Sequence, residues 1–175
     1  AYYVTKFFTD HLPKNRALSE NTVKSYRDAL ILLLQFFQEQ LHISPDRISY
    51  SDFTSDNMES FLQWLENERR NSASTCNQRL AAIHSFFRYV QYKDPESFEQ
   101  SSIVLSVPFR KSAPVPMNYM SLDEVKALLE KPDQSTRNGL REMAILVILY
   151  ETAARAQEFI DLKLSSIRFG SPAVI

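Results

Sequence analysis

Apolar residues recur at helical spacing along most of this chain, and this periodicity limits its fold more than any other feature. Side chains three and four residues apart lie on one face of an α-helix. After Ser19, a favourable N-cap residue, one such stripe predicts a helix to about Gln40; it contains Val23, Tyr26, Leu30, Leu33, Leu34, Phe37 and Leu41. A later stripe has the 4-3-4-3 spacing of a buried helix face and contains Cys76, Leu80, Ile83, Phe87 and Val90.

Two shorter patterns complete a set of four helices in the first half of the chain. Apolar residues between Tyr2 and Leu12 predict a helix that Pro13 ends. Thr54 or Ser55 is expected to cap another helix, whose inward face contains Met58, Phe61, Leu62 and Leu65. Only two glycines occur, which excludes a glycine-rich phosphate loop and favours a mainly α-helical fold.

The second half begins with two further helices. Ser121 is expected to cap a helix that ends before Pro132. Thr136 precedes a helix that is apolar nearly all round near its end, so we expect it to be buried in a core. The segments SSIRF (165–169) and PAVI (172–175) then predict the strands of a first hairpin.

Residues 94–118 separate the two halves. They include four prolines, show no helical periodicity and have a basic centre, which is the composition of an extended linker. We therefore predict a helical domain at 1–93, a proline-rich basic linker at 94–118 and an α+β segment at 119–175.

Composition excludes several classes of protein. The single Cys76 allows no internal disulfide and no signal peptide is present, so we expect a cytoplasmic location. No apolar run is long enough to cross a membrane. One cysteine and three scattered histidines give no cluster of metal ligands, so we expect no metal site.

The charge distribution points to a polyanionic partner, although the net charge is only −1. No Asp or Glu occurs between Arg69 and Lys93, where five basic residues stand, nor between Gln100 and Leu122, where Arg110 and Lys111 stand. Solvated helices usually mix both signs, so an acid-free helix is a candidate nucleic-acid surface.

Arg155 is the candidate catalytic residue. It follows the small residues Thr152, Ala153 and Ala154 at the start of a new helix, where a guanidinium could hold a phosphate. Glu158, one turn later, could orient it. The same two residues could equally be an ordinary ion pair on a helix.

The residues from Thr152 to Phe159 resemble the T-G-x-R-x-x-E-L motif of the tyrosine recombinases, the phage integrase family. Ala153 replaces the usual glycine and Phe159 the usual leucine, and alanine suits this corner only if the backbone avoids positive φ. The openings of two helices, Ser19–Tyr26 and Ser74–Leu80, are similar to the core-binding domain of that family. The order of parts matches over essentially the whole chain.

This resemblance implies a four-helix SAM-like core-binding domain that closes round double-stranded DNA together with a catalytic domain, of which only the first part is present. The helices at 19–40 and 74–93 would then lie against the major groove. Basic residues there would neutralise phosphates, namely Lys24, Arg27, Arg79 and Arg88. Polar residues would reach phosphates or base edges, namely Thr75, Asn77 and Gln78. In the linker, Arg110 and Lys111 would follow the DNA backbone.

The chemistry that the resemblance implies is strand cleavage and rejoining through a phosphotyrosine, with no external cofactor. Arg155 would be the first phosphate ligand and Glu158 a supporting residue. The family's other catalytic residues lie downstream of this arginine, and after Arg155 the chain has no histidine and no tyrosine. We therefore expect a fragment that binds DNA without cleaving it, monomeric in solution although the full-length protein would act as a tetramer.

Two alternatives remain open from the sequence. The chain could be a non-catalytic helical DNA-binding protein, or a helical protein-interaction module in which Arg155 and Glu158 are purely structural. Salt-dependent affinity for duplex DNA separates the second alternative from the other readings.

Overall fold

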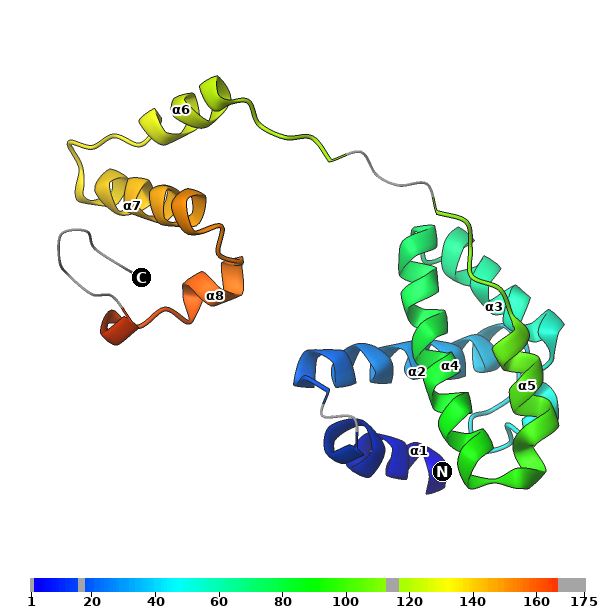
Figure 1. Cartoon of the computed structure of the whole chain (residues 1–175). Coiled ribbons are helices and arrows are strands. Elements are labelled where there is room, and N and C mark those ends of the chain that lie inside the picture. Colours follow the sequence, from blue (N-terminus) through cyan, green and yellow to red (C-terminus); the bar gives the residue numbers. More distant parts are fainter. Residues whose placement is uncertain (1, 16–17, 113–116, 167–175) are drawn as a thin grey trace. The chain divides into compact units, whose positions relative to one another are not determined.

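The computed structural model describes residues 2–15, 18–112 and 117–166, and it divides the chain into two compact units (Figure 1). The first unit is Ala1–Pro114 and the second is Val115–Ile175. Each unit is described by itself.

The first unit is built from helices whose starts were predictable from their caps. Its main helices are α2 (Glu20–Gln40), α3 (Ser55–Asn67) and α4 (Ala73–Lys93). The hydroxyls of Ser19, Thr54 and Ser72 each accept a hydrogen bond from the backbone N–H three residues later. These bonds satisfy amides that have no partner inside the helix, which is why the helices begin there. A short 3₁₀ turn, η2 (Tyr50–Asp52), precedes α3.

The N-terminal helix runs farther than expected. It starts as α1 (Tyr2–Lys6) and continues as a π-helix, η1 (Phe7–Asn15), which contains Pro13. Proline removes a backbone donor and crowds the preceding turn of an α-helix. A π-helical turn shifts the hydrogen-bond register by one residue, and this wider turn accommodates Pro13 where an α-helix would end.

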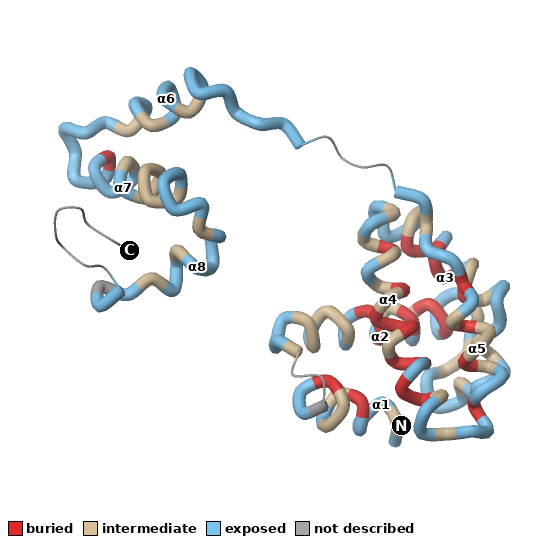
Figure 2. The backbone as a smooth tube through the Cα atoms, viewed as in Figure 1, coloured by how far each residue is buried: buried red, intermediate tan, exposed pale blue. Residues whose placement is uncertain are grey.

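The core of the first unit lies around α4, which packs against α2, α3 and α5. The predicted stripe of α4 is buried throughout and the inner faces of α2 and α3 are buried against it, as Figure 2 shows. Aromatic rings fill much of this core. For example, the ring centroids of Trp64 on α3 and Phe36 on α2 are 5.8 Å apart. Burial of these apolar faces is the main source of stability for such helices.

The stretch that we expected to be an extended linker contains two helical segments instead. These are η3 (Pro95–Ser97) and α5 (Phe98–Ser106), and α5 packs on α4. Pro95 stands in the first turn, where a missing N–H costs nothing, and the Asp94 carboxylate caps the Glu96 N–H at 3.2 Å. Val104 and Val107 are buried in the core. The helical unit therefore extends well beyond residue 93.

The second unit consists of α6 (Leu122–Glu130), α7 (Arg137–Thr152), α8 (Ala156–Ile160) and a 3₁₀ turn, η4 (Leu164–Ser166). The predicted caps are confirmed, because Ser121 and Glu124 form a reciprocal capping box and Thr136 caps Gly139. Gly139 is required at its position, since a Cβ there would collide with the backbone carbonyl of Asp133. Gly139 is also the single buried residue among those described in this unit.

The burial expected for α7 is absent from the described part of the second unit. Its apolar residues from Ile145 to Leu149 are only half-buried, because α6 is the one helix that packs substantially against them.

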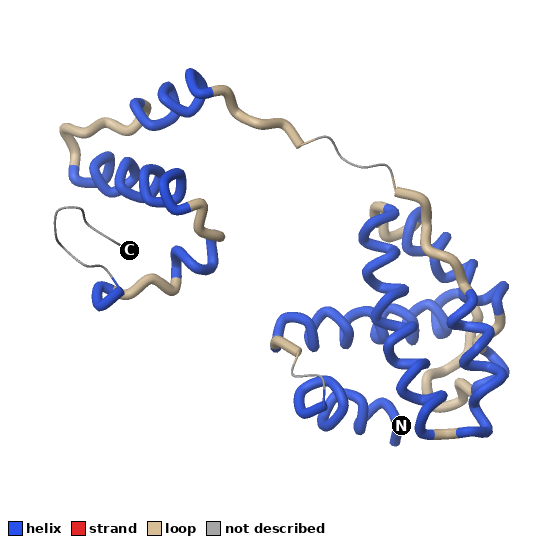
Figure 3. Tube along the Cα trace, in the orientation of Figure 1, coloured by secondary structure: helices blue, strands red, loops and turns tan. Residues whose placement is uncertain are grey.

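The described residues form helices and turns with no strand (Figure 3). In the predicted first strand, Ser165 and Ser166 belong to the turn η4. The remainder of that segment and the predicted second strand fall at 167–175, outside the described residues. None of the described helices is long and apolar enough to span a membrane, and the described side chains include no group of three or more potential metal ligands.

Candidate nucleic-acid interface

The outward face of α2 carries two of the predicted DNA-binding residues. Lys24 and Arg27 are exposed. At about 100° per residue Lys24 lies opposite the buried Leu33, whereas Arg27 lies about 60° from the buried Leu30, at the edge of the buried face. The guanidinium of Arg27 lies 3.5 Å from the carboxylate of Asp28, its neighbour in sequence. Both side chains of this pair are mostly exposed, so the interaction is weak and leaves Arg27 available.

Arg88 lies on the outward face of α4, beside α2. Its exposed side chain lines a hollow of about 430 Å³ together with His11, Tyr26, Ala81, Ser85, Tyr89 and Tyr92. Tyr26 belongs to α2 and Ser85 to α4, so the two helices predicted to face DNA border the same depression.

Arg79 and Thr75 are less exposed than their predicted role suggests. Arg79 is half-buried, and its Nε is buried with no hydrogen-bond partner in the described structure. The Thr75 hydroxyl lies 3.0 Å from that of Ser72, which caps α4, and Thr75 is half-buried. Gln78, in contrast, is exposed.

Asn77 lies on the side of α4 that faces α5 and the residues after it. Three polar residues at heptad spacing, Asn77, His84 and Gln91, bind this segment. The Gln91 amide donates to the Ser102 hydroxyl at 2.9 Å, and the His84 ring lies 5.4 Å from that of Phe109. Burial lowers the pKa of His84, against a smaller opposing effect of its hydrogen bond to the Val104 carbonyl.

Arg110 is bound to Asn77 through its backbone and to α3 through its side chain. Its N–H donates to Asn77 Oδ1 at 2.7 Å, and its carbonyl accepts from Asn77 Nδ2 at 2.9 Å. Its guanidinium donates to Glu59 at 2.7 Å and to Glu66 at 3.0 Å. Burial alone would lower the pKa of Arg110, but hydrogen bonds and charge from the two glutamates outweigh it and raise the pKa. Lys111, next in the chain, is exposed.

The corner before Arg155 has a geometry that differs from expectation. Ala153 terminates α7 in the left-handed conformation, with φ 50° and ψ 25°, so the condition under which alanine would suit this corner, a backbone without positive φ, is not met. Helices commonly end on a left-handed residue, usually glycine. The Thr152 hydroxyl supports the turn, since it donates to the Ile148 carbonyl at 2.6 Å and accepts from the Ala154 N–H at 3.3 Å.

Arg155 and Glu158 form the predicted pair at the start of α8. The carboxylate of Glu158 accepts from the Arg155 backbone N–H at 2.8 Å and from its guanidinium at 2.9 Å. The Arg155 side chain is 85% exposed. Glu158 therefore caps the helix and orients an arginine that faces solvent in the described structure.

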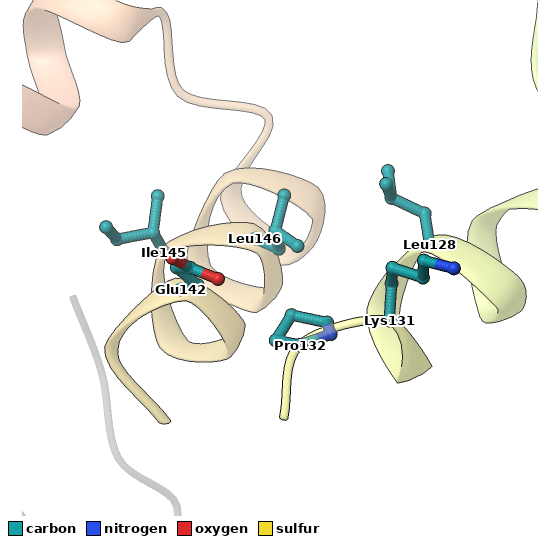
Figure 4. Close-up of a pocket in the computed structure, with 6 residues that line it drawn as sticks. All are labelled: Leu128, Lys131, Pro132, Glu142, Ile145 and Leu146. Atoms are coloured by element: carbon teal, nitrogen blue, oxygen red, sulfur yellow. The ribbon is translucent and has the colours of Figure 1, made fainter. Parts of the chain in front are cut away.

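The second unit also has an apolar hollow that no motif had indicated (Figure 4). It has a volume of about 330 Å³ and lies between α6 and α7, with Leu128, Lys131, Pro132, Glu142, Ile145 and Leu146 around it. It is part of the half-buried face of α7.

Comparison with known proteins identifies the first unit. Residues 6–93 match the phage integrase N-terminal SAM-like domain. The chain is 36% identical over 167 residues to a Sinorhizobium fredii protein named as an integrase/recombinase, y4rC; the match covers 95% of this chain and 50% of that one.

Two recombinases show the same pattern of coverage. Identity to the tyrosine recombinase XerD of Vibrio vulnificus is 30% over 165 residues, with 94% of this chain and 50% of XerD covered. Identity to the tyrosine recombinase XerC of Herpetosiphon aurantiacus is 31% over 161 residues, with 91% and 50% covered. The chain thus spans about half the length of these curated relatives. It belongs to the tyrosine recombinase, or phage integrase, family.

Proposed function

We propose that these residues are the N-terminal half of a site-specific DNA recombinase, which cleaves and rejoins double-stranded DNA through a phosphotyrosine intermediate. Family membership supports the reaction class. In this proposal the first unit binds duplex DNA with the outward faces of α2 and α4, and the second unit contributes Arg155 to the site of cleavage.

The observation that carries the DNA-binding proposal is a set of cations without acidic partners. Within the described parts of the chain, Lys24, Arg79 and Arg88 form no ion pair with a carboxylate. By contrast, Arg69 lies 3.6 Å from Glu39 and stacks over the Trp64 ring.

Arg79 differs from Lys24 and Arg88, because it is half-buried and its Nε has no hydrogen-bond partner among the described residues. A buried donor without an acceptor is unfavourable by about 1–3 kcal/mol, and more when it belongs to a charged group. Because this Nε is buried, a DNA phosphate would have to contact Arg79 through its terminal guanidinium nitrogens. The proposed contacts are therefore Lys24, Arg27, Thr75, Gln78, Arg79, Arg88 and Lys111; Arg79 and Arg88, nine residues apart, lie on opposite sides of α4.

We propose Arg155 as a ligand of the scissile phosphate, with Glu158 as the residue that holds it. The planar guanidinium matches two phosphate oxygens, and a cation beside the phosphate stabilises the charge that develops during strand cleavage. Because no tyrosine follows Arg155 in these residues, we propose that they bind DNA but form no covalent bond with it. We also propose a monomer for this chain and a tetramer on DNA for the whole protein.

Charge reversal on α4 tests the DNA-binding face. The double variant Arg79→Glu with Arg88→Glu should bind a labelled duplex at least tenfold more weakly than the unsubstituted chain at the same salt concentration. Arg47→Glu is the control for a charge reversal elsewhere on the surface, because Arg47 is exposed in the loop beyond α2 and forms no ion pair with a described residue. Equal affinities for the double variant and the control would refute the assignment of this face.

The absence of cleavage has its own test. A nick in the cleaved strand, a few nucleotides beyond the scissile phosphate, lets the short 5′-hydroxyl strand dissociate after cleavage and so prevents rejoining. Any phosphotyrosine product would then migrate as a protein–DNA adduct on a denaturing gel. We expect no adduct with these 175 residues, and an adduct would overturn the proposal that the nucleophile lies elsewhere.

A further inference from the structure

Residues 107–110 follow the last helix of the first unit, yet they are bound to it by three separate contacts. Val107 is buried in the core and Phe109 packs against the His84 ring. Arg110 makes the third contact, with α3 and α4 together. Lys111 and Ser112 are exposed. The chain thus leaves the first unit after Arg110 and not after α5.

The contact of Asn77 with the backbone of Arg110 is the most informative. One carboxamide satisfies both the N–H and the carbonyl of a single residue 33 positions away. A paired donor and acceptor of this kind fix the position and the direction of the main chain at that residue. Asparagine has the required geometry because its side chain carries the same two groups as a peptide bond.

The guanidinium of Arg110 adds a second attachment, to α3. Glu59 and Glu66 stand two turns apart on one face of α3, and Arg110 bridges them. The Arg110 side chain is 21% exposed, so the bridge is partly shielded from solvent and ions. Charge-assisted hydrogen bonds of this kind are stronger than neutral ones.

We infer that Asn77 and Arg110 anchor the linker: they hold residues 107–110 on α3 and α4, and they act by positioning the linker and not by contact with DNA. With the anchor closed, the chain available to join the two units begins at Lys111. Without it, that chain begins at Pro108, because Val107 stays buried in the core, and its maximum reach grows by about 10 Å for the three added residues. The anchor therefore limits the range of positions in which the unit that carries Arg155 can meet DNA held by the first unit.

This inference rests on the proposed function for its consequence at DNA, but the anchor itself can be measured without DNA. Amide hydrogen exchange of residues 107–112 reports directly on whether the segment is held. Asn77→Ala and Arg110→Gln should each raise the exchange of the backbone amide at position 110 by about tenfold or more. Lys111→Gln, the matched neighbour, should leave it unchanged.

Duplex binding over a salt series separates an anchor from a phosphate contact. Arg110→Gln should leave the salt slope unchanged, while loss of a phosphate contact lowers its magnitude by about one. An unchanged exchange rate in both anchor variants would overturn the inference, and so would a salt slope reduced by about one in Arg110→Gln. Fluorescence of Trp64, buried in the same unit, verifies that each variant is folded, and Glu66→Gln provides a milder second variant.

If the unsubstituted chain binds no duplex at any salt concentration, the proposed function fails, and the exchange comparison alone still supports or overturns the anchor.

Discussion

The substitution Val104→Ala tests whether α5 is an integral part of the helical unit. Val104 is fully buried, and its neighbours in the core come from α4 and the residues around it. The change removes two methyl groups, each worth about 0.8 kcal/mol of transfer free energy. The cavity that remains adds to this loss, because a packed core relaxes only partly. We expect the free energy of unfolding to fall by about 2–3 kcal/mol.

The single tryptophan of the chain makes this measurement specific. Trp64 lies in the core of the first unit and is 4% exposed, so its fluorescence during urea unfolding reports that unit and not the second one. The free energy of unfolding of a domain of this size falls by about 2 kcal/mol per M of urea. The urea concentration at the midpoint of unfolding should therefore fall by roughly 1–1.5 M in Val104→Ala. The m-value should stay the same.

Val4→Ala is the matched control, since Val4 is 40% exposed and its truncation should change stability by less than about 0.5 kcal/mol. If the two substitutions shift the midpoint equally little, α5 does not fold cooperatively with the other helices, and the helical unit ends near residue 93 after all.

Three further predictions concern single residues. Ala153→Gly should slow amide exchange at the end of α7 and Ala153→Val should accelerate it, because the left-handed backbone there strains alanine by about 1 kcal/mol and a β-branched residue by more. Cys76 is buried, and burial raises the pKa of its thiol; labelling by a thiol reagent should therefore be slow in the folded chain and rapid in urea. The lowered pKa of buried His84 means that the unfolded chain binds a proton more readily below about pH 6.5, so stability at pH 7 should be partly lost as the pH falls towards 5. Urea unfolding of His84→Gln should show a weaker loss over the same range.

Local signals predicted most of the helices. Ser19, Thr54, Ser121 and Thr136 cap the helices they were expected to cap, because a cap depends on atoms only three residues away. The stripe from Cys76 to Val90 is buried because one regular spacing places all five side chains on one face.

Features that depend on distant partners were not predictable in the same way. The prolines of the linker concealed α5. Its Val104, and Val107 just after its end, are buried only because the segment packs against α4. Asn77 and Arg110 have the residue types of DNA contacts, but their partners in the structure are each other and two glutamates on α3. The heptad spacing of Asn77, His84 and Gln91 was the available signal that this side of α4 packs against protein.

The burial of α7 in the second unit was also not predictable from the sequence of the helix alone. An apolar helix such as α7 predicts a core, but its burial depends on which elements surround it, and within the described residues those are few. Arg155 and Glu158 were predicted as a pair because they stand one helical turn apart, and their contact is confirmed. The role of Arg155 at a phosphate stays a prediction.

The salt dependence of duplex binding by the unsubstituted chain tests the proposed DNA-binding face most directly. Each phosphate neutralised contributes about −0.9 to the slope of log K against log salt concentration. Lys24, Arg27, Arg79 and Arg88 together predict a slope of about −4, and Lys111 would make it slightly steeper. A slope near zero, or no measurable affinity at low salt, would contradict the proposal and favour a helical module that binds protein.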